Sequence, residues 1–76
     1  MTDHDIAAAW AAKTGHACRV VMVAFSSYIV ETTDEGDRVY RPEVLRDHKG
    51  KKAPAQVVID AAARPVFLEA GVTLAD

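Results

Sequence analysis

The sequence contains very little cysteine, few aromatic residues and no long hydrophobic run. Cys18 is the only cysteine of the 76 residues, so no disulfide can form within the chain, and a lone thiol is typical of the reducing cytoplasm. The longest strongly apolar run, VVMVAF, has six residues, whereas a membrane-spanning helix needs about 20. The N-terminus lacks the basic stretch of a secretory signal peptide. These absences predict a cytoplasmic protein with no membrane partner.

Familiar catalytic and ligand-binding motifs are absent as well. Ser26 and Ser27 have no GxSxG context, and the four glycines are too scattered to form a phosphate-binding loop. His16 and Cys18 have a spacing that two metal ligands could use, but a structural zinc site needs four ligands. We therefore expect no catalytic residue, no metal site and no cofactor. Cys18 is interpreted as a buried structural thiol.

The residues that are present indicate one small globular domain. Half of the chain is apolar and about a quarter is charged, which is the composition of a folded protein rather than a disordered one. With only five aromatic residues, the core must consist mainly of Val, Ala, Ile and Leu. We predict a single domain over residues 1–76, with marginal stability because so small a domain buries only about 60% of its unfolded surface.

The N-terminal residues predict a helix over residues 3–14. Thr2 or Asp3 can cap it, and the stretch IAAAWAAK is rich in alanine, the strongest helix former. Ile6 and Trp10 are four residues apart and share one face. Gly15 is the expected end of the helix.

The following residues predict antiparallel strands. Residues 17–32 are rich in Val, Ile, Phe and Tyr, and their apolar residues fall on both faces, which is typical of a strand covered on both sides. Because sixteen residues would make an unusually long strand, we expect a bend, bulge or tight turn at Ser26–Ser27. A hairpin with three to five loop residues around Gly36 should lead into a strand over residues 37–41. The acids nearby are expected to be solvated: Glu31, Asp34, Glu35 and Asp37.

The C-terminal half predicts one or two helices. A short helix should begin at Pro42 and end at Gly50, with His48 and Lys49 in its last turn. A continued strand is the alternative for this stretch. A second helix should begin at Pro54 and end before Pro65, although residues 56–60 and 66–69 could also be strands. The predicted fold class is therefore α+β, a small two-layer domain with the order α-β-β-(β)-α-α.

Charge is distributed unevenly along the chain. Residues 38–52 hold six basic and two acidic side chains, a balance of +4, whereas the whole chain has a net charge of −2. Both flanking segments are acidic. This asymmetry indicates an electrostatic surface, and the candidate partner-binding residues are Arg38, Arg41, Arg46, Lys49, Lys51 and Lys52.

Two functions are compatible with these features. The first is a non-enzymatic protein-interaction module that binds a larger partner, a protein or a protein–nucleic acid complex, through a basic face and an exposed apolar patch. In general character such a chain is similar to the small proteins with which phages and mobile elements inhibit host machinery, including anti-CRISPR inhibitors. The alternative is a nucleic-acid-binding regulator that uses residues 38–52. A homodimer is a further expectation, because the strand near Val20–Ala24 requires cover on both faces.

Overall fold

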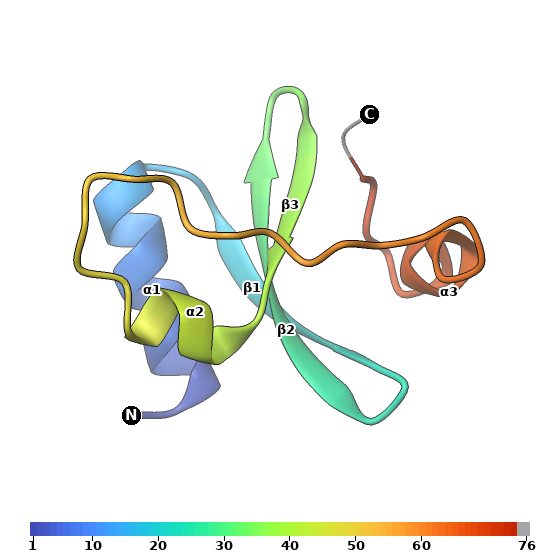
Figure 1. Ribbon diagram of the computed structural model, residues 1–76, viewed down its shortest axis with the longest axis horizontal. Helices are drawn as coiled ribbons and strands as arrows, with labels where there is room; N and C mark the ends of the chain where they lie inside the picture. The colour runs from blue at the N-terminus through green and yellow to red at the C-terminus, as the bar shows by residue number, and fades with distance from the viewer. Residues whose placement is uncertain (75–76) are drawn as a thin grey trace.

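The computed structural model describes residues 1–74 and confirms the α+β architecture. Along the chain, the elements are α1 (Asp3–Thr14), β1 (Cys18–Val23), β2 (Ser26–Thr33), β3 (Gly36–Tyr40), α2 (Pro42–Arg46) and α3 (Arg64–Glu69). The three strands form one antiparallel sheet in the order β1-β2-β3. Figure 1 shows α1 and α2 on one side of this sheet and α3 on the other.

Helix α1 has the bounds and the buried face that its sequence predicts. The Thr2 side chain accepts a hydrogen bond from the Asp5 amide, and the Asp5 carboxylate accepts one from the Thr2 amide, so the two residues form a capping box. Gly15 ends the helix in the left-handed conformation, with φ of 78°. Ile6, Ala7 and Trp10 are buried, and they form the face that packs on the sheet.

The two hairpins of the sheet have tighter loops than predicted. Strand β1 pairs with β2 from Cys18 opposite Glu31 to Val23 opposite Ser26, so only Ala24 and Phe25 remain to form the first loop. The predicted turn at Ser26–Ser27 is therefore two residues too late, because both serines pair with β1. The second loop consists of residues 34 and 35, and Gly36 has the expected positive φ, at 122°.

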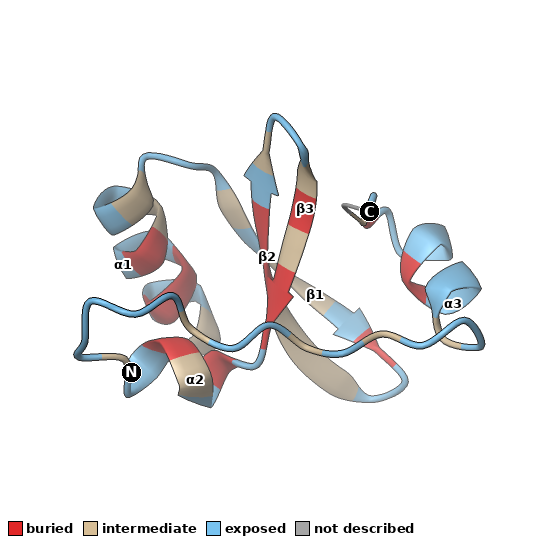
Figure 2. Ribbon diagram, turned by 45° about the horizontal axis from the view of Figure 1, so that its top comes forward, coloured by how far each residue is buried: buried red, intermediate tan, exposed pale blue. Residues whose placement is uncertain are grey.

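Both faces of the sheet are covered, and the buried residues of Figure 2 accordingly lie on both. Adjacent strand residues point to opposite faces. Ile29 and Tyr40 thus pack with Ile6, Trp10 and Leu45 on the α1 side. On the other side, a second core consists of Val23, Val30, Val39, Phe67 and Val72. The expectation of cover on both sides is thus met for Ile29 and Val30 of β2, whereas Met22 of the edge strand β1 is 62% exposed.

The helix predicted to begin at Pro54 does not form. Residues 53–60 instead have no regular secondary structure, and in Figure 1 they cross the front of the sheet from α2 toward α3. The Val57 amide donates a hydrogen bond to the Val39 carbonyl at 2.8 Å. Val57 and Ile59 pack on the second core while Val58 is 94% exposed, an alternation with the period of an extended chain. Covering the sheet therefore overrides the alanine-rich helical pattern.

The two C-terminal helices also differ from the predicted bounds. Helix α2 begins at Pro42 as expected but ends at Arg46, so His48 and Lys49 lie in the following loop rather than in its last turn. Pro65 was expected to end a helix, but it lies in the first turn of α3, where a missing amide hydrogen costs little. Residues 66–69 are thus helical.

Two of the acids expected to be solvated are buried instead. Asp37 is 7% exposed and Glu31 is 1% exposed. The Asp37 carboxylate accepts hydrogen bonds from Arg19 at 3.1 Å and from the Thr73 amide at 3.0 Å. Arg19 also donates to the Gly71 carbonyl. Asp37 thereby attaches the end of the described chain to β3.

Candidate functional site

The Glu31 carboxylate is the centre of a buried polar cluster on the α1 side of the sheet. Its Oε1 atom accepts a hydrogen bond from the Trp10 indole at 2.7 Å. Its Oε2 atom lies 2.6 Å from His16 Nδ1 and 3.7 Å from Arg38 Nη1. Along β2 and β3, the second-core residues Val30 and Val39 are next to Glu31, Arg38 and Tyr40 in the sequence. Since neighbouring strand residues point to opposite faces, all three of these side chains lie on the α1 face of the sheet. Each carboxylate oxygen therefore has a partner despite its burial.

A groove, here called the Glu31 groove, lies above this cluster. It has a volume of about 600 Å³ and lies between the end of α1, strands β2 and β3, and residues 48–54. Trp10, His16, Glu31, Arg38 and Tyr40 are among its lining residues. Burial, reinforced by the Glu31 charge, raises the pKa of the Tyr40 hydroxyl.

The loop that follows α2 is held in place by His48. The Lys13 ammonium donates to His48 Nδ1 at 3.3 Å, and His48 Nε2 donates to the Lys52 carbonyl at 2.5 Å. The imidazole also packs edge-on against the Trp10 ring, with 5.5 Å between centroids. These contacts tie residues 48–52 to α1, so the wall of the Glu31 groove is formed without a ligand.

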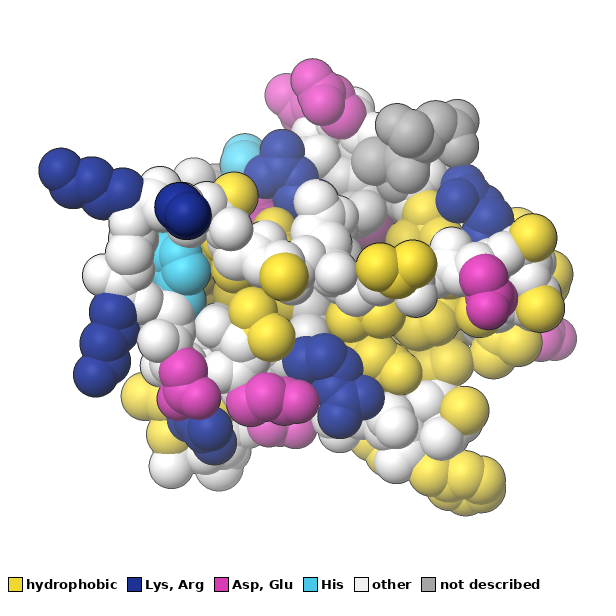
Figure 3. Space-filling view, viewed as in Figure 1, with side chains coloured by type: hydrophobic (Ala, Val, Ile, Leu, Met, Phe, Trp, Pro, Cys, Tyr) yellow, Lys and Arg dark blue, Asp and Glu magenta, His cyan; other side chains and the backbone are white. Residues whose placement is uncertain are grey.

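The six candidate partner-binding residues do not form one cluster. Arg38, Lys51 and Lys52 line the Glu31 groove, together with Lys13, which the sequence did not single out. Arg41, Arg46 and Lys49 do not line it. In Figure 3 the dark blue side chains on the left of the view lie over α1, α2 and the loop after α2, with acidic side chains among them.

Carboxylates pair with all three arginines of this set. Arg38 is near Glu31, Arg41 pairs with Glu43 at 3.3 Å, and Arg46 forms two bonds with Asp47 at 2.9 and 3.0 Å. The guanidinium of Arg41 also lies 5.5 Å from the Tyr28 ring centroid. By contrast, within residues 1–74 no carboxylate forms an ion pair with the three lysines Lys49, Lys51 and Lys52. The lysines are thus the cations available to a partner.

A second feature, the loop of the first hairpin, was not identified from the sequence as a site. Phe25 is 100% exposed at the tip of this hairpin, and Met22 beside it is 62% exposed. Ala24 and Phe25 both have positive φ, at 50° and 65°. At the lower right of Figure 3, hydrophobic side chains protrude where the β1–β2 hairpin ends.

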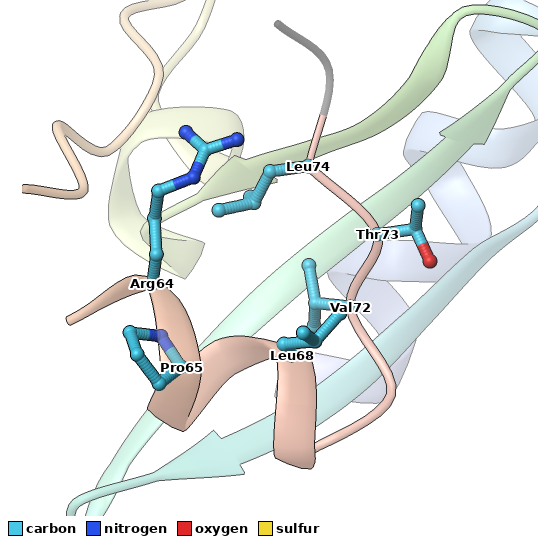
Figure 4. A pocket seen from close by; sticks show the side chains of 6 residues that line it. All are labelled: Arg64, Pro65, Leu68, Val72, Thr73 and Leu74. Atoms are coloured by element: carbon cyan, nitrogen blue, oxygen red, sulfur yellow. The ribbon is translucent and has the colours of Figure 1, made fainter. Parts of the chain in front are cut away.

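Further apolar side chains lie around α3. Val66 and Leu68 are exposed on this helix. Figure 4 shows the side chains that line a hollow between α3 and the chain after it: Arg64, Pro65, Leu68, Val72, Thr73 and Leu74. The hollow has a volume of about 280 Å³. The molecule therefore has a mainly apolar side around α3 and a side rich in cations around α1 and α2.

Cys18 packs against the first core and is partly buried. Burial raises the pKa of its thiol from 9.0 to about 11, and the nearby Glu31 charge adds to this shift. A thiol with a raised pKa is a poor nucleophile near neutral pH. Residues 1–74 contain no group of three or more His, Cys, Asp and Glu side chains placed to hold a metal ion.

Sequence reasoning missed Glu31 and His16 because their pairing spans two elements. One signal was present: Glu31 has the same strand parity as Ile29, so any strand that buries Ile29 directs Glu31 to the same face. The partner of such a carboxylate cannot be read from local spacing.

Comparisons with known proteins identified no relative of this chain. A scan against protein-family models and searches of curated proteins and of solved structures found no match to this chain. Among the helices of residues 1–74, none has the length and apolar character to cross a membrane.

Proposed function

We propose that this domain is a non-enzymatic protein-interaction module that binds a larger protein partner, with the tip of the β1–β2 hairpin as its apolar anchor. The observation that carries the proposal is the conformation of Phe25, which is fully exposed and has a positive φ of 65°. Aromatic side chains that insert into a partner's pocket commonly dominate binding energy.

The backbone at this tip is unfavourable for its residues. A two-residue loop with both φ values positive favours Asn-Gly, because side chains such as those of Ala24 and Phe25 clash in the left-handed region. The cost is about 1–2 kcal/mol per residue. Strain of this kind concentrates at functional sites.

The side chain of Phe25 makes no stabilising contribution to the free domain that would offset this strain. Its complete exposure means that it buries no surface in the core. Met22, the adjacent exposed residue, accepts a hydrogen bond from Ser27 through its sulfur at 3.0 Å and so has a defined position beside the loop. Met22 and Phe25 together present a protruding apolar surface suited to a pocket.

The lysines would contribute in a different way. Lys49, Lys51 and Lys52 are exposed in the loop after α2. Figure 1 shows this loop on the left of the view, whereas the β1–β2 hairpin ends at the lower right. Exposed charges accelerate and orient association more than they strengthen the final complex. Inhibition of a host cell's machinery, as by small phage proteins, remains a narrower hypothesis within this proposal.

Quantitative affinity capture from the native host tests the proposal, with nuclease-treated and untreated lysates. We expect Phe25→Ser to reduce recovery of the specific partner more than about tenfold, as loss of an anchor residue does. Val58→Ser, which alters another exposed apolar residue, serves as the matched control. Equal recovery by wild type and Phe25→Ser would contradict the proposal.

The nucleic-acid alternative rests on Lys49, Lys51 and Lys52. It has less support, because the arginines of the segment already have carboxylate partners. In addition, Tyr40 is 2% exposed, so the segment has no aromatic surface on which bases could stack. Fluorescence polarisation with labelled RNA and DNA tests it, since binding to the nucleic-acid backbone weakens steeply with salt.

A homodimer is tested by sedimentation, where a concentration-dependent increase in mass is the expected result.

A further inference from the structure

The Glu31 groove concentrates positive charge in a protein that is acidic as a whole. Four basic side chains line it, namely Lys13, Arg38, Lys51 and Lys52, against one carboxylate, so the formal balance is +3. The whole chain has a net charge of −2. Cations that line one groove repel one another, and a bound anion would reduce that repulsion.

Glu31 does not make the groove a cation site. Its two oxygens already accept from Trp10 at 2.7 Å and face His16 at 2.6 Å and Arg38 at 3.7 Å. The carboxylate is 1% exposed, so a ligand in the groove meets the side chains that Glu31 orients rather than Glu31 itself. Its function in the groove is to position His16 and Arg38.

The remaining walls suit the organic part of a small ligand. The buried residues Trp10 and Tyr40 line the groove, as do Ala53 and Pro54 of the loop after α2. A volume of about 600 Å³ is within the range of small-molecule sites. The contacts of His48 with Lys13 and with the Lys52 carbonyl hold this wall in place, so little ordering energy is needed on binding.

From this arrangement we propose that the Glu31 groove binds an organic phosphate of about the size of a sugar monophosphate. A phosphate monoester carries a charge of about −1.5 to −2 at neutral pH, which matches the excess positive charge of the groove. Lys51 and Lys52 contact the phosphate group, because neither forms an ion pair with a carboxylate among residues 1–74. The other two cations are engaged, since Arg38 faces Glu31 and Lys13 donates to His48. Lysine binds phosphate as a point charge.

The site is separate from the proposed anchor at Phe25 and does not depend on it. Phe25 belongs to the opposite end of the sheet, where β1 joins β2, and it does not line the groove. A Phe25→Ser variant should therefore bind the phosphate ligand as the wild type does.

Titration followed by NMR, with ribose 5-phosphate as the probe, tests the inference. We expect the Trp10 indole and the His16 ring signals of the full chain to shift in a saturable way. The double variant Lys51→Ala/Lys52→Ala should bind at least about tenfold more weakly, since each hydrogen bond to a charged group contributes about that factor. Lys49→Ala, which alters a neighbouring lysine outside the groove, should bind like the wild type. Circular dichroism establishes that each variant is folded.

Three further probes define the ligand class. Ribose without phosphate should cause no shift, and inorganic phosphate should bind at the same residues but more weakly. An oligonucleotide should bind when it carries a 5′-phosphate, and the same oligonucleotide without that phosphate should not bind. The proposal is overturned if ribose 5-phosphate gives no saturable shift at millimolar concentration, if the double variant binds it equally well, or if an oligonucleotide binds regardless of its 5′-phosphate.

Discussion

At the scale of single residues, the Glu31 side chain connects several separate parts of the fold. It links Trp10 of α1, His16 of the following loop and Arg38 of β3. Because its carboxylate is buried, these contacts replace water that it cannot reach. The cluster therefore fixes how α1 lies on the sheet.

Replacing Glu31 should destabilise the domain strongly. In Glu31→Gln the buried amide lacks the charge that pairs with His16 and Arg38, and its amino group faces their donors. We expect a loss of about 2–4 kcal/mol in the free energy of unfolding, measured by urea denaturation. Glu35→Gln, at the exposed turn of the second hairpin, should change it by less than about 0.5 kcal/mol. Equal effects of the two variants would refute this role of Glu31.

Cys18 should make stability sensitive to alkaline pH. Its thiol has a pKa of about 11 in the folded domain, above the ordinary 9.0. The unfolded chain therefore releases this proton at lower pH than the folded chain, so the contribution is present below pH 9.0 and is lost as the pH rises toward about 11. The raised pKa of Tyr40 acts with the same sign.

The measurement is the thermal midpoint between pH 8 and 11. We expect it to fall less steeply in Cys18→Ala than in the wild type, because the variant has no thiol to ionise. Parallel pH profiles for the two proteins would contradict a shifted thiol pKa.

At the scale of elements, the sequence predicted local features better than those set by distant contacts. Helix α1 was predicted correctly because its cap, its alanine content and Gly15 are all local signals. The stretch AQVVIDAAAR also has helical features, yet residues 53–60 form no helix because Val57 and Ile59 cover the second core. That core includes Phe67 and Val72, and no local pattern reveals their proximity.

For the candidate site too, local features could be predicted from the sequence and contacts between distant residues could not. The basic segment was evident from composition, but only Arg38, Lys51 and Lys52 of its six candidates line the Glu31 groove. The arginine pairings depend on helix ends and strand register. The proposed anchor, Phe25, was missed because the pattern favoured a turn at the two serines, whereas pairing of β1 with β2 requires the loop at Ala24–Phe25.

Amide hydrogen exchange tests the extended course of residues 53–60. The Val57 amide donates to the Val39 carbonyl at 2.8 Å, so it should exchange slowly, as hydrogen-bonded amides in a stable core do. The amide of Val58, whose side chain is exposed, should exchange fast. Slow exchange at every residue from 57 to 62 would instead indicate the helix that the sequence predicts.

At the scale of the whole molecule, the two sides differ in chemistry. The side around α3 and the β1–β2 hairpin exposes apolar residues, while the loop after α2 exposes lysines without carboxylate partners in residues 1–74. A partner that contacts both would be oriented by charge and held by apolar contact.

Reversing the charge of the exposed lysines should slow association with the partner without changing the stability of the domain. The triple variant Lys49→Glu, Lys51→Glu, Lys52→Glu changes the net charge from −2 to −8, because each reversal changes it by two. All three side chains are exposed, so the thermal midpoint should change little. Association with the captured partner should slow by about tenfold or more at low salt and by less at high salt. An unchanged association rate would show that these lysines do not steer binding.

The central claim is that the domain retains a strained hairpin tip because Phe25 binds a partner. The most direct test is the free energy of unfolding of Ala24→Asn/Phe25→Gly, whose residues suit a loop with positive φ at both positions. Phe25→Ser, which removes the ring but keeps a side chain at positive φ, is the matched control. The account predicts that the double variant is more stable than the wild type by about 1–2 kcal/mol, while both variants lose partner recovery. A double variant no more stable than the wild type would contradict it.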